Sequence, residues 1–464
     1  MSSLRPAFSV VIVARPSWSL TALVKVAPLL LTLASTALTS CVSYQPRPLS
    51  AEASSVAFAG RSFADPGLRQ FLIEQKAASG TWEVNELALA AAYFHPDVAL
   101  ARAEAEEIAA GIKTAAMRPN PVLTFGPQFA SSQVNDITPW FMAGNLFIPV
   151  ETAGKRTRRT EQARAAAEAA RWRVSSRAWA ARSRVRVALL ELHSARENIR
   201  LLETEQKLHE EAIKKLTAQM EAGAVSPFEL TQARLALNRA RLALQDAQRL
   251  AATGEAKLAA AIGVPLTALK SITLDFSGFD KLPAPDLSTS RRRALTQRAD
   301  LMALLADYAA TEAGLRLELA KQYPDVRLGP GYDYNQGQDR WQLGISLDLP
   351  INRNRGPIAQ AEAKRKTAEA RFLAQQDTIQ GEFDIAIAAY EASRAKAQTA
   401  ATLSQAAEAA ADTTKRMVEA GELSPLELTR RQIESSTANL ARRAADLEAQ
   451  TAAGALEDAM QARL

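Results

Sequence analysis

Few side chains in this chain of 464 residues could carry out covalent or metal chemistry. There is one cysteine, Cys41, whose thiol could form a thioether with a lipid; three histidines, His95, His193 and His209, could bind a metal or transfer a proton. The histidines lie in segments of helical pattern, and we expect no Glu or Cys to complete a metal site with them. There is also no glycine-rich phosphate loop and no nucleophile elbow. The sequence therefore predicts no enzyme, no metal site and no cofactor.

Cys41 follows a segment with the layout of a bacterial secretory signal. Arg15 and Lys25 precede an uncharged apolar run, 26–38, which is too short to cross a membrane as a helix. The four residues that end at Cys41, Leu-Thr-Ser-Cys, resemble the lipobox of bacterial lipoproteins, in which the cysteine is lipidated and begins the mature chain. We therefore expect a signal peptide over 1–40, lipidation of Cys41 and an N-terminal extension over 41–82.

The charge of the chain does not indicate a nucleic-acid partner. The formal net charge is +6, but Arg5, Arg15 and Lys25 all precede the first acidic residue, Glu52, so removal of residues 1–40 leaves +3 (6 − 3). The other basic residues are spread among acidic ones, which leaves no large basic field. Aromatic residues make up only 6% of an alanine-rich chain, a composition typical of long helices.

One structural plan occurs twice, about 200 residues apart. The peptide EAGAVSPFELT over 221–231 returns as EAGELSPLELT over 419–429, an offset of 198. Asp97 returns as Asp300 at an offset of 203, and Trp140 as Trp341 at 201. Offsets that drift by so few residues indicate a duplicated unit. We expect one repeat over 83–285 and a second over 286–464.

Each repeat contains a pair of strand-like runs, at about 121–149 and about 324–350. Apolar and polar residues alternate with a period of two, which is typical of transmembrane barrel strands. Two amphipathic hairpins that cover a soluble core remain the alternative on this pattern alone. If the runs lie in a bilayer, one face meets lipid (Leu328, Tyr332, Leu343, Ile345, Leu347) and the other a water-filled lumen (Arg327, Asp333, Gln342, Ser346, Asp348).

Each pair of strands is followed by a helical hairpin too long for a compact domain. From Pro149 to Gly223 there are 74 residues, and from Pro350 to Gly421 there are 71, so each helix could reach about 100 Å. Glycine, then Ser-Pro, suits a helix end followed by a new helix start. We expect these repeated tips to form a gate and an adaptor-docking surface, with nine candidate residues: Glu221, Gly223, Ser226, Pro227, Glu419, Gly421, Glu422, Ser424 and Pro425.

With this order of elements the chain resembles the TolC family of outer-membrane efflux channels, from about residue 83 to the C-terminus. ETAGKR over 151–156 and LPINRNRG over 349–356 are similar to patterns of its CzcC-like heavy-metal branch. Thr152-Ala153 and Arg355 depart from that branch, which has Leu-Gly and Gln there.

The resemblance implies a mainly α-helical protein with a membrane β-barrel portion. It implies a homotrimer, because four strands cannot close a barrel whereas three copies give a 12-stranded barrel above a helical tunnel. The implied partners are a periplasmic adaptor, an inner-membrane RND pump and outer-membrane lipid, and the expected cargo is a heavy-metal cation. A drug efflux channel of the same family and a periplasmic adaptor or scaffold lipoprotein are the alternatives.

Overall fold

The computed structural model describes residues 42–77, 80–129, 140–284, 286–335 and 338–464. Cys41 and the predicted signal peptide lie outside the described residues. The chain divides into two units. In the first, Met1–Ala57, the described residues have no regular structure up to Ser50 and then enter helix α2 (Ala51–Ala59). The second unit, Phe58–Leu464, contains the other elements and is described from here on.

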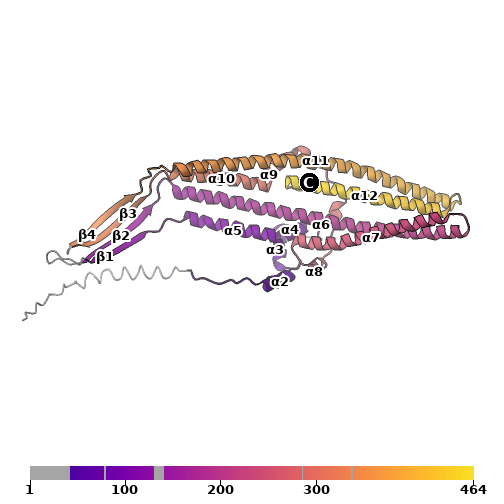
Figure 1. The fold of residues 1–464 in the computed structure, drawn as a ribbon, viewed down its shortest axis with the longest axis horizontal. Helices are drawn as coiled ribbons and strands as arrows, with labels where there is room; N and C mark the ends of the chain where they lie inside the picture. Colours follow the sequence, from indigo (N-terminus) through magenta and orange to yellow (C-terminus); the bar gives the residue numbers. More distant parts are fainter. Residues whose placement is uncertain (1–41, 78–79, 130–139, 285, 336–337) are drawn as a thin grey trace, which may run out of the picture. The chain divides into compact units, whose positions relative to one another are not determined.

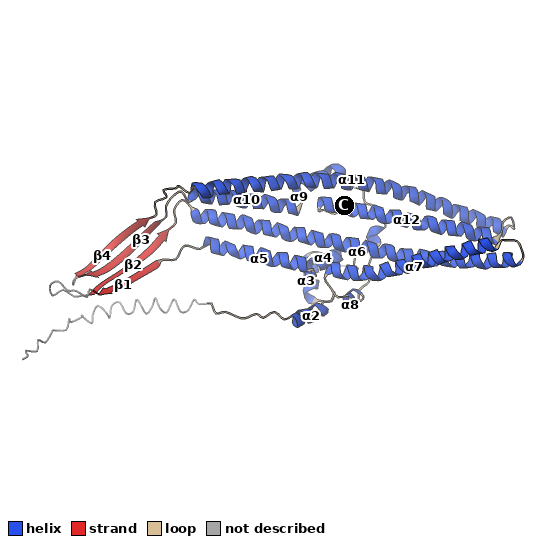
Figure 2. Ribbon diagram, viewed as in Figure 1, coloured by secondary structure: helices blue, strands red, loops and turns tan. Residues whose placement is uncertain are grey.

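The two halves of the second unit repeat the same order of elements (Figure 1). Each has two helices directly before a β-hairpin, followed by a very long helix and a returning helix, and three short helical elements lie outside this repeated order. Helices are blue and strands red in Figure 2. The first half consists of α3 (Pro66–Glu74), α4 (Val84–Phe94), α5 (Pro96–Ala116), β1 (Val122–Phe129), β2 (Trp140–Val150), α6 (Lys155–Glu221), α7 (Pro227–Ile262) and α8 (Leu266–Leu269). The second consists of η1 (Ser277–Phe279), α9 (Leu287–Gln297), α10 (Ala299–Ala320), β3 (Val326–Asn335), β4 (Gln338–Leu347), α11 (Arg355–Glu419) and α12 (Pro425–Met460).

The sequence pattern predicts one helical segment before each hairpin, over 87–117 and 291–322, but the structure breaks each segment into two helices. In the first half α4 ends at Phe94 and α5 begins at Pro96, because proline lacks an N–H group and suits the first turn of a new helix. His95 caps the new helix, since its Nδ1 accepts a hydrogen bond from the Asp97 N–H at 3.1 Å. In the second half the corresponding break falls at Arg298, between α9 and α10.

The long helices form where the sequence predicts them: apolar residues such as Val185 and Leu192, seven positions apart, are typical of packed long helices. Helix α6 has 67 residues and α11 has 65, which at 1.5 Å per residue gives about 100 Å each. Val185, Leu192 and Leu202 of α6 are buried, and α7 returns along α6 as α12 does along α11 (Figure 1). Gly254 of α7 lies against Leu192 of α6, where an added Cβ would make ordinary van der Waals contact at 3.5 Å, so the packing there does not require glycine.

The largest apolar core lies where α3, α4 and α8 pack against α6 and α7. Leu68, Leu87, Leu189, Leu258 and Ile262 are fully buried in it. A second core, built around Ile379, Phe383 and Leu456, joins α11 to α12 and α9. Both cores lie along the long helices and contain no strand residue, so they stabilise the helical body and not the sheet.

The four strands form one antiparallel sheet in the order β1-β2-β3-β4, so β2 and β3 join the two repeats. Directly opposite residues share a face of a sheet. Leu328 pairs with Ile345 and Tyr332 with Trp341, whereas Arg327 pairs with Ser346. The predicted apolar and polar faces of this hairpin are therefore present. Among the described residues, no helix is both long and apolar enough to cross a membrane.

Candidate functional site

The two hairpin tips have matching backbone geometry. Gly223 has φ +72° and Gly421 has φ +83°, in the left-handed region that favours glycine. At the first tip the Ala224 N–H donates to Gln219 O and the Gly223 N–H to Met220 O, the bond pattern of a Schellman motif. The second tip repeats both bonds, from Glu422 to Met417 and from Gly421 to Val418. The repeated sequence thus encodes a repeated helix stop.

Each tip also begins its returning helix in the predicted way. Ser226 and Ser424 are the N-cap residues, and Pro227 and Pro425 occupy the first helical turn. Only Ser424 uses its side chain, accepting a hydrogen bond from the Glu427 N–H at 3.3 Å. The nine candidate residues, acidic ones included, are exposed. Their role in gating or docking stays a prediction.

The structure brings the two tips of one chain together. Lys215 of α6 donates from Nζ to Thr429 Oγ1 at 2.6 Å and to Pro425 O at 3.2 Å. Arg430 of α12 lies 3.5 Å from a carboxylate oxygen of Glu229 on α7. A small apolar cluster (Ala212, Leu216, Leu230, Leu426) packs beneath these contacts. Sequence reasoning did not indicate which tip residues would contact each other.

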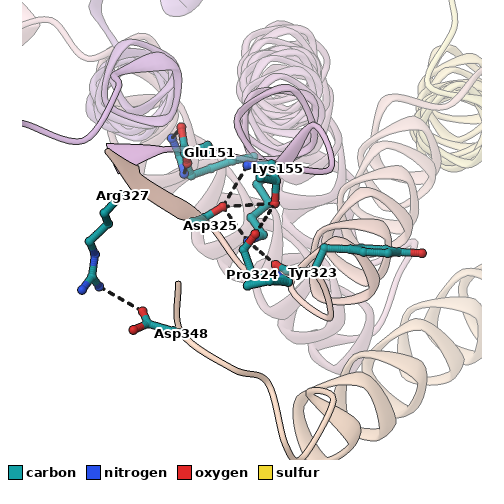
Figure 3. A network of polar contacts seen from close by, with 9 residues as sticks. Glu151, Lys155, Tyr323, Pro324, Asp325, Arg327 and Asp348 are labelled. Carbon is teal, nitrogen blue, oxygen red and sulfur yellow. Dashed lines mark hydrogen bonds and ion pairs between the residues drawn. The ribbon is translucent and has the colours of Figure 1, made fainter. Parts of the chain in front are cut away.

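A second polar network joins the strands to the helices at the β2–α6 junction (Figure 3). The side chain of Lys155, 9% exposed, donates to Asp325 Oδ1 and to Tyr323 O, both at 2.7 Å. The Thr152 N–H donates to the same carboxylate oxygen at 2.9 Å, and the Thr152 hydroxyl donates to Pro324 O at 2.6 Å. The start of α6 in one repeat is therefore fixed to the start of β3 in the other.

Arg159 extends this junction to the first repeat's own strand. It donates to Ala115 O at 2.8 Å and to Met117 O at 2.9 Å, which satisfies carbonyls at the end of α5, and it pairs with Glu151 at 2.7 Å. Glu151 and Lys155 belong to the motif that carried the family resemblance. The sequence analysis predicted no contact for these two residues. Their position next to the end of a predicted strand, with opposite charges, was the feature that could have indicated one.

The three histidines are structural in this arrangement. Burial and nearby Arg184 lower the pKa of His95, and burial lowers the pKa of His193, whose ring stacks on Phe276 at a centroid distance of 4.9 Å. His209 does have an acidic neighbour one turn away, Glu205, at 3.7 Å, which the sequence reading overlooked. Nevertheless no group of three or more His, Cys, Asp or Glu side chains that could hold a metal ion occurs in the described part of the chain.

The comparisons with known proteins agree with this architecture. The model of the outer membrane efflux protein family matches residues 89–264 and 291–461, which is most of both halves. The chain belongs to the outer membrane efflux protein family. It is therefore an outer-membrane efflux channel that extends into the periplasm, a transport protein and not an enzyme. This membership excludes the adaptor or scaffold alternative.

A relative and two solved structures extend the comparison. The cobalt-zinc-cadmium resistance protein CzcC of Cupriavidus metallidurans is 24% identical over 351 residues, covering 74% of this chain and 82% of that protein. The crystal structure of CusC superposes with a TM-score of 0.65 at 16% identity, covering 81% of this chain and 91% of CusC. The outer membrane protein VceC of Vibrio cholerae gives 0.65 at 19% identity, with 82% and 96% covered.

Proposed function

We propose that this efflux protein works as a homotrimer that conducts heavy-metal cations from an inner-membrane RND pump and a periplasmic adaptor to the cell exterior. The observation that carries the proposal is the four-stranded sheet whose edges are β1 and β4. Four strands are too few to close a barrel, and an unpaired strand edge cannot be left in lipid. Three copies would supply twelve strands and pair each β4 with the β1 of a neighbour.

The metal cargo is supported by the relationship to CzcC, whose name assigns it to cobalt, zinc and cadmium resistance. Because the described residues contain no cluster of metal ligands, the chain would conduct cations without binding them, and the pump would determine which metal is exported. Drug or small-molecule efflux is the second candidate, since the fold itself is shared with channels such as VceC.

We also propose that the tips form the periplasmic gate and the docking surface for the adaptor. They are exposed polar loops at the ends of the long helices that are remote from the strands (Figure 1). Glu221, Glu419 and Glu422 are the acidic side chains that would face the lumen or the adaptor. Cys41 would carry the lipid anchor, in addition to the barrel.

The test is a deletion strain challenged with zinc, cobalt, cadmium, nickel and copper and with a panel of drugs. We expect metal sensitivity that a plasmid copy of the gene reverses, with unchanged drug tolerance. Sensitivity to drugs alone would replace the proposed cargo by the second candidate. Bulky substitutions at both Gly223 and Gly421 should remove this complementation while trimers still form, and full complementation by that variant would contradict the tip assignment.

A further inference from the structure

The turns that join the strands to the two long helices share one backbone conformation. Residues 153–154 before α6 and 353–354 before α11 have positive φ, at an offset of 200. In each turn an N–H donates to the carbonyl oxygen three residues back, from Lys155 at 3.2 Å and from Arg355 at 3.1 Å. Arg355 is therefore the counterpart of Lys155. Arg353 has φ +44°, in the region that favours glycine, so a smaller residue would fit this turn with less strain.

The first junction neutralises two of its basic side chains. The ammonium group of Lys155 pairs with Asp325 at the start of β3, at 2.7 Å (Figure 3). The guanidinium group of Arg159 pairs with Glu151 at the end of β2, also at 2.7 Å. Both acids lie directly beside strand ends, so the chain supplies its own counter-charges at this junction.

The second junction leaves its arginines without counter-charges. Arg353 and Arg355 are exposed, and no acid in the described part of the chain pairs with either of them. The acid at the end of β4, Asp348, pairs instead with Arg327 at 2.9 Å (Figure 3). The same turn therefore carries a neutralised lysine in the first repeat and two free positive charges in the second.

The trimer would not supply the missing acid. Within one chain β2 pairs with β3, and Asp325 at the start of β3 is the partner of Lys155. Where β4 meets a neighbouring copy, β1 would take the place of β3. The counterpart of Asp325 is then Val122 (325 − 203), which cannot pair with Arg355. Arg118, which precedes β1, is exposed and adds a third positive charge at this position.

Apolar side chains lie directly before the two arginines. Leu349 and Ile351 are 74% and 89% exposed. The period of two would place Leu349 on the same face as Leu347, which is the face expected to meet lipid. The long helices begin at this end of the sheet and extend into the periplasm, so the junction would lie at the periplasmic surface of the outer membrane (Figure 1). An apolar surface that ends in positive charges there matches a phospholipid, which has acyl chains and a phosphate.

We propose that Arg353 and Arg355, together with Arg118 of the neighbouring copy, bind the phosphate of an anionic phospholipid, while Leu349 and Ile351 contact its acyl chains. This inference rests on the proposed function, because it needs the strands in the outer membrane and β4 next to β1 of a second copy. Guanidinium groups suit phosphate because their N–H donors match its oxygens in pairs. An anionic lipid is favoured over a zwitterionic one because the three arginines have no acidic partner among the described residues.

Native mass spectrometry of the detergent-purified trimer tests the lipid site. The protein is mixed with phosphatidylglycerol or with phosphatidylcholine of the same acyl chains, and the lipid retained by each trimer is counted. We expect several-fold more phosphatidylglycerol to be retained. Arg353→Gln with Arg355→Gln should remove most of that difference, whereas Arg353→Lys with Arg355→Lys, which keeps the charges, should keep more of it. The matched control is Arg371→Gln with Arg394→Gln, which makes the same change in charge at exposed positions of α11 and should retain lipid as the parent does.

The outcomes separate the lipid site from the assembly on which it depends. A trimer that retains both lipids equally overturns the site, as does equal lipid retention by the parent and by the Arg353→Gln, Arg355→Gln variant. Displacement of the lipid by inorganic phosphate at the same concentration would show that a free anion occupies the site, and would overturn the lipid as its ligand. A monomer overturns the proposed trimer itself. If the glutamine variant does not assemble, the comparison of the two lipids on the parent protein decides.

Discussion

The sharpest prediction concerns two adjacent residues of β4, Gln342 and Leu343. The strand has ten residues, and these are the fifth and the sixth. Ten residues at about 3.4 Å each, tilted by about 45°, rise roughly 24 Å, which matches the apolar band of an outer-membrane barrel. Both residues would therefore lie at the middle of the bilayer, and the period of two sends their side chains to opposite faces.

Leu343→Arg should prevent assembly, whereas Gln342→Arg should not. Leu343 is 72% exposed in the single chain and would meet lipid, where an arginine at the midplane costs about 2 to 4 kcal/mol. That is roughly a 30- to 1,000-fold effect for each copy, and a trimer would carry it three times. Gln342 shares its face with Gly331 and would face a water-filled lumen, where substitution removes at most its 3.3 Å hydrogen bond to Asn145.

The assay is the amount of heat-modifiable trimer in the outer-membrane fraction, measured for both variants at equal expression. The expected result is a normal amount for Gln342→Arg and almost none for Leu343→Arg. Equal assembly of the two variants, or loss of both, would refute the placement of the strands in the bilayer. The contrast does not depend on any residue of the helical body, so a general folding defect cannot imitate it.

Three further predictions address the junction, the tips and the half-buried His193. Lys155→Met should lower the free energy of unfolding by about 2 kcal/mol, because it removes charged hydrogen bonds at a largely buried site. Thermal melting measures this loss, and the control Lys113→Met, at an exposed position, should show no comparable loss. Gly421→Ala should cost about 1 kcal/mol in the same assay through its positive φ alone, since no atom lies within 4 Å of the added Cβ; an unchanged melting temperature would contradict the Schellman geometry. Burial lowers the pKa of His193 in the folded chain. The neutral ring therefore favours folding above pH 6.5, the approximate pKa of an unfolded histidine, and this stability should be lost as the pH falls through the folded pKa. His193→Gln should accordingly show a melting temperature that depends less on pH below about pH 6.5.

The sequence was sufficient for the order of elements because each element carries a local signal. The Gly and Ser-Pro positions of the tips, the heptads of α6 and the alternation in β3 are all properties of neighbouring residues, and each appears in the structure where it was predicted. The breaks at His95 and Arg298 were missed, although Pro96 was visible, because the apolar pattern continues through both positions. The pairing of Glu205 with His209 was also missed, although residues four apart in a helix lie on the same face.

The contacts between the repeats could not be predicted in the same way. Lys155 and Asp325 are 170 residues apart, and Lys215 and Thr429 are 214 apart, so no periodicity relates them. Their pairing depends on how α6 packs between its neighbours, which is a property of the assembled helices. The lipidation of Cys41, the boundaries of the two repeats and the functional role of the tips remain predictions.

Native mass spectrometry of the detergent-purified, membrane-extracted protein tests the central claim most directly. We expect a mass of three chains, because the four described strands of each chain must close into a barrel of twelve with an open lumen. A monomer would leave the sheet open. A dimer would give eight strands, whose interior is just wide enough to be filled by side chains, and either result would contradict the account of this protein as a channel.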